Sequence, residues 1–292
     1  IYSNRGDGLP VLVASPIDAL DKDGLVQLAD GSRFLVRQGR LEHTEYLDDV
    51  WKVSEERSQT HIATVSAHTS SLFADLGKVR VGVKTTADKV FIRDDWDTLP
   101  DHLRPELLRP LLTHHCARRY RALRGSNSRK ILYPHEVLGG RRQPCDLSKY
   151  PKSAAYLEQH RDVLEARTYV KESGRRWYEL WVPQNPDMWS RPKLVFRDIS
   201  EKPTFWLDLS GAVVNGDCYW LPMQDQNDPR LWLALAVANS SFIEWYYDVQ
   251  FNNKLYAGRR RFMSQYVEQF PLPQADIPTA RSLVALAKQL FD

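Results

Sequence analysis

Two segments of the sequence combine arginine with glycine and small polar residues and contain no acidic residue. Segment 118–130 (RRYRALRGSNSRK) carries six positively charged residues, and segment 252–261 (NNKLYAGRRR) carries four. A guanidinium group binds phosphate oxygens or the edge of guanine through paired hydrogen bonds, and an asparagine amide pairs in the same way with adenine. These segments therefore predict contact with nucleic acid. The alternative is a solvated basic face.

Further candidates lie outside these two segments. Lys84 and Thr85 are expected in a polar loop between two strands, and Arg197 at the end of another strand. Asn253 and Arg259 are the predicted base-reading residues. If the remaining cations contact phosphates, the logarithm of affinity should fall with the logarithm of salt concentration, with a slope near about −0.9 per phosphate. The full candidate set is Lys84, Thr85, Arg118, Arg119, Arg121, Arg124, Arg129, Lys130, Arg197, Asn252, Asn253, Lys254, Arg259, Arg260 and Arg261.

The sequence offers no recognisable catalytic centre. It contains no GxGxxG and no GxxxxGK[ST] loop for a nucleotide cofactor, no Asn/Asp-Pro-Pro-aromatic loop and no G-x-S-x-G elbow. Asp198 with Glu201-Lys202 resembles a nuclease motif but misses the Glu-x-Lys spacing by one residue. His114, His115 and Cys116 are adjacent, and side chains of neighbouring residues diverge, so a shared metal is not expected. We expect neither a catalytic residue nor a metal or cofactor in this chain.

Composition places the chain among globular proteins. Of 292 residues, 42% are hydrophobic and 26% charged, with a formal net charge of +3. Three widely spaced cysteines make no disulfide framework, which favours a cytoplasmic location. No apolar run is long enough to cross a bilayer. The sequence begins with Ile1 rather than Met, from which we expect a piece of a longer protein.

Hydrophobic periodicity predicts an α+β fold with a mixed or antiparallel sheet and several packed helices. Asp228-Pro229 is the clearest helix start, with an N-cap and a proline in the first turn. Ser153 is a second predicted cap, and the polar segment 54–61 is expected to be a linker. Leucines between 103 and 112 have near-helical spacing. Predicted strands are 10–13, 25–28, 34–36, 78–83, 89–92, 131–134, 193–196, 204–207 and 218–221, and predicted helices are 153–167, 229–245 and 279–291.

Six segments, in order, resemble the TaqI-like specificity domain of adenine-N6 DNA methyltransferases. Segment 81–92 is similar to the opening of that domain, with Thr86 where glycine is usual and Asp88 where asparagine is usual. The remaining five are 129–134, 156–181 with its WYEL stretch, 191–200 (RPKLVFRDIS), 235–246 with Asn239-Ser240, and 261–273. Within RPKLVFRDIS, Arg197 stands where the family often has proline. The resemblance covers about residues 75–275.

This resemblance implies an enzyme of two halves, of which the chain supplies one. The other half would use S-adenosylmethionine to methylate the exocyclic amine of an adenine flipped out of the duplex. The chain would grip double-stranded DNA and read bases from the major groove. The expected partners are DNA, the catalytic domain of the same parent and, in some members, a nuclease domain or subunit; no membrane is expected. The alternatives are a protein-interaction scaffold of a phage-defence assembly and an unrecognised hydrolase or nuclease.

The expected domain organisation has three parts. Residues 1–70 form a small β-rich junction towards a missing catalytic domain. Residues 71–276 form the target-recognition domain, and residues 277–292 form a C-terminal helix.

Overall fold

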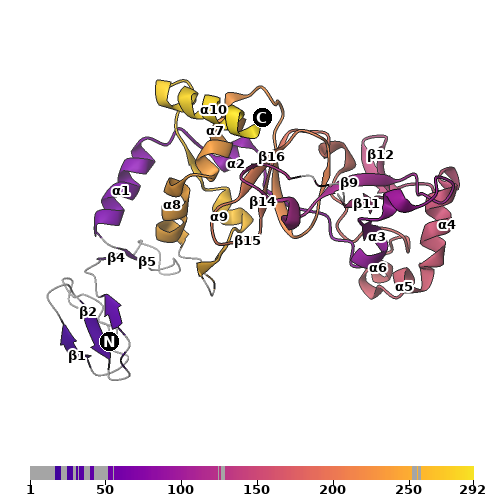
Figure 1. The fold of residues 1–292 in the computed structure, drawn as a ribbon, viewed down its shortest axis with the longest axis horizontal. Helices are drawn as coiled ribbons and strands as arrows, with labels where there is room; N and C mark the ends of the chain where they lie inside the picture. Colours follow the sequence, from indigo (N-terminus) through magenta and orange to yellow (C-terminus); the bar gives the residue numbers. More distant parts are fainter. Residues whose placement is uncertain are drawn as a thin grey trace. The chain divides into compact units, whose positions relative to one another are not determined.

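The computed structural model describes residues 17–20, 25–28, 31, 33–35, 40–42, 52–54, 56–123, 125, 129–251, 255 and 258–292. Backbone contacts divide the chain into two compact units, Ile1–His68 and Thr69–Asp292. Each unit is described by itself. Figure 1 shows the ribbon, with grey trace for the residues outside the description.

The first unit is built from hairpins and one helix. Strands β1 (Ile17–Leu20), β2 (Leu25–Leu28) and β3 (Arg33–Leu35) form an antiparallel sheet, and β4 (Arg40–Glu42) pairs with β5 (Lys52–Ser54). The predicted strands 25–28 and 34–36 correspond to β2 and β3, and Gly31 between them has a positive φ of 83°, which suits a tight turn. The predicted linker at 54–61 was wrong because α1 (Glu56–Ala67) covers most of it. The predicted strand at 10–13 lies outside the described residues.

The second unit contains two main sheets. The larger has the order β10-β16-β14-β18-β7, in which only the β10–β16 pair is parallel. The smaller has the order β17-β9-β11-β8, with β17 parallel to β9 and the other pairs antiparallel. The fold is therefore α+β with mixed sheets, as predicted. The strands are β7 (Arg80–Val81), β8 (Ile92–Arg93), β9 (Leu108–Leu112), β10 (Tyr120–Arg121), β11 (Lys130–Leu132), β14 (Lys193–Arg197), β16 (Phe205–Asp208), β17 (Val213–Val214) and β18 (Cys218–Pro222).

Three short strand pairs and nine described helices complete this unit. In Figure 1, α7 and α10 lie together at one end of the larger sheet, and α3 to α6 gather around β9 and β11. The pairs are β12 (His135–Leu138) with β13 (Arg141–Pro144), β15 (Ile199–Ser200) with β19 (Arg260–Arg261), and β6 (Ser71–Leu72) with β20 (Pro271–Leu272). The helices are α2 (Phe73–Leu76), α3 (Asp88–Phe91), α4 (Pro151–Gln159), α5 (Arg161–Glu165), α6 (Thr168–Glu172), α7 (Pro229–Ala238), α8 (Ser241–Phe251), α9 (Ser264–Val267) and α10 (Pro278–Phe291).

Buried aromatic side chains form the core between the sheets. Trp189 and Trp220 lie 4.5 Å apart between ring centroids, and Trp96 packs edge-on against Tyr156 at 4.9 Å. Each of the three tryptophans is at most 1% exposed. Large aromatic rings remove the most apolar area from water. These contacts pack the turns at 96–98 and 186–189 against α4 and β18 respectively.

Helix α7 begins as predicted and ends earlier than predicted. The Asp228 carboxylate accepts a hydrogen bond from the Arg230 amide at 2.9 Å, which confirms the N-cap. The predicted continuation to 245 was wrong, because the chain breaks after Ala238 and restarts as α8. The Asn239 amide bonds the backbone N–H and C=O of Phe205 at 3.0 and 2.9 Å. The Asn239 side chain therefore links the end of α7 to β16, at the position where the helix is interrupted.

Two other predicted elements were also wrong or altered, and the near-helical spacing of the leucines at 103–112 does not correspond to a helix. Leu108, Leu111 and Leu112 lie in β9, which pairs with β11 and β17. Segment 89–92 is mostly the short helix α3. Ser153 is not a cap, since it lies within α4 and its hydroxyl bonds the Glu106 carboxylate at 2.7 Å. Local spacing could not reveal these tertiary partners.

Candidate nucleic-acid interface

Two adjoining hollows, of about 410 and 540 Å³, open on the surface of the second unit and share Asp88 and Asn215. We call their combined surface the polar groove. A third hollow of about 300 Å³ adjoins it through Thr113 and Arg129. The polar side chains that line the groove come from five separate segments of the chain and include four cations and four aspartates: Lys84, Thr85, Thr86, Asp88, Lys89, Arg93, Asp94, Asp95, Thr113, Arg129, Asn215 and Asp217.

Backbone hydrogen bonds hold the centre of the groove. The Asn215 amide N–H donates to Leu112 at 2.8 Å, its carbonyl accepts from Cys218 at 3.0 Å, and Val83 donates to Val214 at 2.7 Å. A Cβ atom on Gly82 would lie 2.0 Å from the Asn215 carbonyl oxygen. Only glycine therefore permits this approach, and the 214–216 turn is wedged against the end of β7.

The Lys84–Asp88 turn forms one wall. Thr85, predicted to contact DNA, is only 1% exposed. Its hydroxyl donates to the Asp88 carboxylate and accepts from the Ala87 N–H at 3.0 Å, and its carbonyl accepts from Arg167 at 2.8 Å. The prediction for the Thr85 side chain is corrected, because its bonding capacity is used inside the turn. Lys84 is exposed beside it and faces the groove.

A cluster of cations surrounds the other wall. His114 bonds the Asp217 carboxylate through Nδ1, and its ring stacks on His115 with centroids 3.9 Å apart. The pKa of His115 is lowered, first by the charge of His114, then by burial and by the charges of Arg129 and Arg197. The Asp217 carboxylate acts on the His115 pKa in the opposite direction, so the surface next to the groove combines these arginines with a carboxylate.

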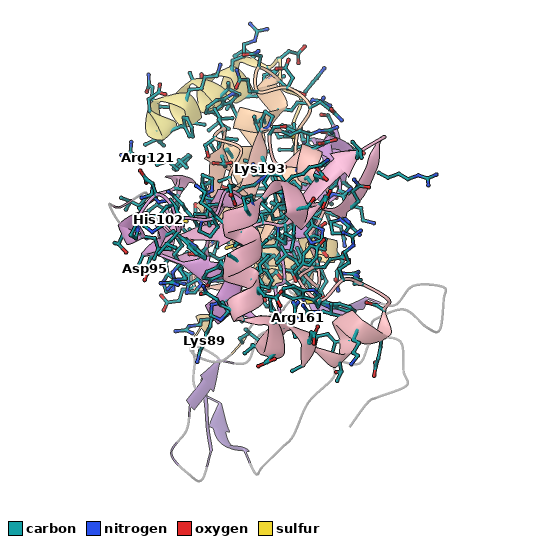
Figure 2. All side chains as sticks on the ribbon, turned by 90° about the vertical axis from the view of Figure 1, so that its right-hand side faces the viewer. Lys89, Asp95, His102, Arg121, Arg161 and Lys193 are labelled. Carbon is teal, nitrogen blue, oxygen red and sulfur yellow. The ribbon has the colours of Figure 1, made fainter. Side chains whose placement is uncertain are left out.

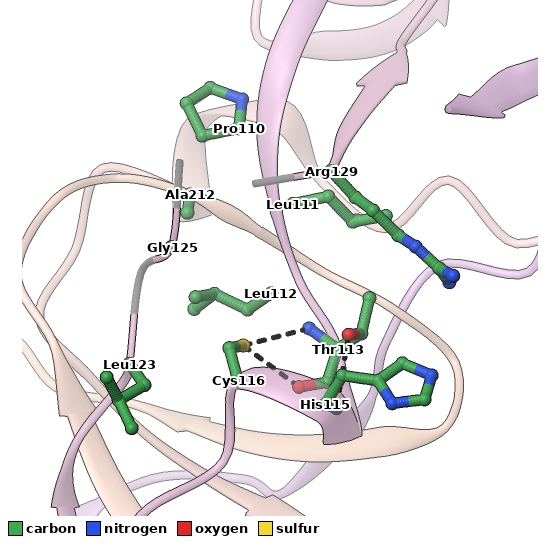
Figure 3. Close-up of a pocket in the computed structure, with 10 residues that line it drawn as sticks. All are labelled: Pro110, Leu111, Leu112, Thr113, His115, Cys116, Leu123, Gly125, Arg129 and Ala212. Carbon is green, nitrogen blue, oxygen red and sulfur yellow. Dashed lines mark hydrogen bonds between the residues drawn. The ribbon is translucent and has the colours of Figure 1, made fainter. Parts of the chain in front are cut away.

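Figure 3 shows how the same turn is fastened. The Cys116 thiol donates to the Thr113 carbonyl at 2.9 Å and accepts from the Thr113 N–H at 3.3 Å. The side chains of His115 and Arg129 point to the same side of the third hollow, away from Leu112 and Leu123. This hollow thus has an apolar floor, with Arg129 and the His115 imidazole at its rim.

A separate hollow of about 450 Å³ places Arg197, Lys202 and Arg259 together. Arg197 links this hollow to the surroundings of His115, because it lines the hollow and its charge also lowers the pKa of His115. Arg259 is exposed, as its predicted role requires. Cations from strand β14 and from the loop before β19 therefore share one surface.

Arg260 and Arg261, which follow Arg259 in the sequence, pair with acidic side chains of the same chain. Arg260 is 8% exposed; it bonds Asp248 at 2.6 and 2.7 Å and the Glu201 carbonyl, and lies 3.2 Å from Glu244. Its predicted DNA contact is corrected, because this buried network occupies the guanidinium. Arg261 is half exposed and pairs with Asp198 at 3.2 Å.

The other predicted cations are spread over the surface. Arg118, Arg119 and Arg121 are exposed and each donates to a backbone carbonyl, of Ala117, Pro203 and Asp292 respectively. Lys130 is held by Asp97 at 2.6 Å. In the view of Figure 2, Arg121 and Lys89 project from the same side of the molecule. Arg124, Asn252, Asn253 and Lys254 lie outside the described residues.

Lys89, Thr113, His115 and Asn215 were missed as candidates. Asn215-Gly216 is a turn signal in the sequence, and Lys89 stands in a segment expected to be a strand. No spacing rule connects residues 84, 113, 129 and 215, since only the sheet topology brings them together.

Three further findings concern metal-binding clusters, the resemblance to a nuclease motif and membrane-spanning helices. No group of three His, Cys, Asp or Glu side chains within the described ranges is arranged to hold a metal ion. Asp198 of the suspected nuclease motif pairs with Arg261, and the Glu201 carbonyl accepts from Arg260. Among the described helices, none is long and apolar enough to span a bilayer.

Comparison with known sequences gives a consistent set of relatives. A profile of the TaqI-like C-terminal specificity domain matches residues 143–272. The chain is 37% identical over 265 residues to the Type II methyltransferase M.BanIII of Aneurinibacillus aneurinilyticus, which covers 90% of the chain and 46% of that relative. It is 28% identical over 205 residues to the Type II methyltransferase M.PaeR7I of Pseudomonas aeruginosa, covering 69% of the chain and 33% of the relative.

A solved structure shares the fold. The Type IIL restriction-modification enzyme MmeI, determined in complex with DNA, matches with a TM-score of 0.51 and 15% identity over 75% of this chain and 28% of that chain. The chain spans about half the length of M.BanIII and a smaller share of MmeI.

Proposed function

Because residues 143–272 form a TaqI-like C-terminal specificity domain, we propose that the chain is the part of an adenine-N6 DNA methyltransferase that recognises a sequence in double-stranded DNA. In this role it holds the duplex so that the target adenine faces a catalytic part outside this chain. The observation that carries the proposal is the polar groove, which presents the exposed cations Lys84, Lys89 and Arg129 beside four aspartates and is partly built from the matched segment.

The chemistry of the groove supports a phosphate backbone as its ligand. Lys84, Lys89 and Arg129 are exposed around it, and Arg259 and Arg197 extend the positive surface. Lysine and arginine supply most of the affinity for duplex DNA by releasing condensed counterions. Contacts of this kind position a protein on DNA, while base-edge contacts give specificity.

We place S-adenosylmethionine and the methyl transfer in the remainder of the parent protein. The sequence of this chain holds no GxGxxG loop and no Asn/Asp-Pro-Pro-aromatic loop, which supports placing the cofactor in the other part. The relatives are Type II methyltransferases about twice as long as the chain or longer, which supports this division.

The same reasoning extends to organisation and location. We propose that residues 71–276 are the recognition domain, that residues 1–70 join it to the catalytic part and that residues 277–292 form a helix at its edge. A methyltransferase of this kind works in the cytoplasm, where its DNA substrate is. A nuclease domain or subunit is an additional partner in the restriction-modification setting that MmeI exemplifies.

Fluorescence anisotropy of the chain with a labelled duplex tests the proposal. If the four exposed cations Lys84, Lys89, Arg129 and Arg259 each neutralise one phosphate, raising salt from about 50 to about 200 mM should weaken binding about 150-fold. Folding is checked by circular dichroism on the same sample. A folded chain that binds no duplex at low salt would contradict the proposal and favour a protein-interaction scaffold.

A further inference from the structure

The 214–216 turn lies between the two hollows of the polar groove, and none of its residues was among the DNA-binding residues predicted from the sequence. Asn215 and Asp88 line both hollows. The Asp88 carboxylate is engaged by the Thr85 hydroxyl. Asn215 is partly exposed, and its side-chain amide makes no hydrogen bond to another residue in the part of the chain that the structure describes.

The backbone of Asn215 is fixed although its side chain is not engaged. Hydrogen bonds to Leu112 and Cys218 hold its N–H and C=O, and a parallel bridge joins it to Val83. Gly82 packs against its carbonyl so closely that no Cβ fits there. A recognition side chain on a rigid support loses little conformational entropy on binding and keeps a defined direction.

The surroundings of Asn215 match those of a base-reading residue. Lys84 and Asp217 line one hollow beside it. Lys89, Arg93 and Arg129 line the other together with Asp94 and Asp95, of which Asp95 pairs with Arg93. Cations on both sides can contact the two phosphate strands that border a DNA groove, while the turn between them faces the base edges. A side-chain amide carries both a donor and an acceptor, which is the pattern that the major-groove edge of adenine (N6 and N7) requires.

We propose that Asn215 is a specificity-determining residue that reads an adenine edge in the recognition sequence. This inference rests on the proposed function and deepens it by assigning the base contact to the 214–216 turn. The earlier candidate Arg259 would then act on phosphate at the edge of the same surface. Lys84 and Lys89 would contribute affinity without sequence preference.

Selection from a randomised duplex library, followed by sequencing, tests the proposal on the whole 292-residue chain. The wild-type protein should yield a site with one position that is strongly adenine. Asn215→Ala should lose about 5- to 150-fold of the preference at that position and leave the other positions unchanged. Lys89→Ala is the matched control, and it should weaken binding evenly without changing the site.

Asn215→Asp supplies a second, nearly isosteric variant. The carboxylate accepts but does not donate, so the preferred base at the same position should change from adenine towards cytosine, whose N4 amine donates. If both folded variants select the wild-type site with undiminished preference, Asn215 does not read a base. If the wild-type chain binds duplex but selects no site, the inference fails while DNA binding stands; if it binds no duplex, the proposed function fails as well.

Discussion

Arg260 is predicted to stabilise the fold rather than to bind DNA. Its guanidinium is 8% exposed and has carboxylate partners at 2.6, 2.7 and 3.2 Å from Asp248 and Glu244, with the Glu201 carbonyl as a further acceptor. Removing one partner of a buried ion pair costs about 3–5 kcal/mol because the other charge is left without compensation. The Asp248 and Glu244 side chains are 21% and 29% exposed, so water solvates them in part. We therefore expect Arg260→Ala to lower the free energy of unfolding by about 2–3 kcal/mol.

Urea denaturation followed by tryptophan fluorescence measures this loss. The control is Arg259→Ala, which removes the adjacent, exposed arginine and should change stability by less than about 0.5 kcal/mol. The DNA affinity of the two variants should show the opposite order, with Arg259→Ala the weaker binder at a temperature where both are folded. Equal stability of the two variants, together with a selective loss of DNA binding by Arg260→Ala, would refute the assignment. The assignment also explains why a combined change of residues 259–261 is a poor test of DNA contact.

Three further predictions concern His135, the close approach at Gly82 and a buried ion pair. Burial lowers the pKa of His135 to about 3, so the folded protein binds fewer protons there than the unfolded chain, and the free energy of unfolding should fall as pH drops below about 6.5, by about 2 kcal/mol at pH 5. Urea midpoints should show His135→Gln losing less stability at low pH than wild type, and parallel pH curves would contradict this. Gly82→Ala places a Cβ 2.0 Å from a backbone oxygen of the facing turn, so it should lower the free energy of unfolding by about 1–3 kcal/mol and weaken DNA binding. Gly125→Ala, with open space around the added Cβ, should change neither the thermal melt nor the anisotropy titration. Lys193 and Asp208 form an ion pair at 2.9 Å, and their side chains are 0% and 3% exposed. Lys193→Met should lower the free energy of unfolding by about 3–5 kcal/mol, and adding Asp208→Leu should recover much of that loss. Additive losses in the double-mutant cycle would argue against coupling of the two residues.

Elements with strong local signals were predictable from the sequence. Asp228-Pro229 fixes the start of α7 by a cap and a preset φ, and the apolar run at 193–196 gave β14. The near-helical spacing of Leu108, Leu111 and Leu112 is misleading, because β9 pairs with two strands, one of them parallel and distant in sequence. The break at Asn239 failed because its cause is a contact with β16, which no local rule contains.

The sequence predicted the kind of ligand that the candidate site binds but not all of the residues that form the site. Charge clustering pointed to nucleic acid and included Arg129 and Arg259, and the polar loop added Lys84; all three lie exposed around the hollows. It could not tell Arg259 from Arg260, since the difference between them is burial. Asn215 was invisible because a lone asparagine in a turn has no distinguishing pattern. Its position becomes notable only when β17 is paired with β9.

The salt dependence of DNA binding tests the central claim most directly, because it counts the phosphates that the groove contacts. Wild type should show a slope near about −3.6 for four contacts, and Lys84→Ala/Lys89→Ala should reduce it to about −1.8. The matched control is Arg141→Ala/Arg281→Ala, which removes two exposed positive charges that do not line the groove and should leave the slope unchanged. If the groove variant keeps the wild-type slope, or the control variant loses as much, the polar groove is not the DNA-binding surface.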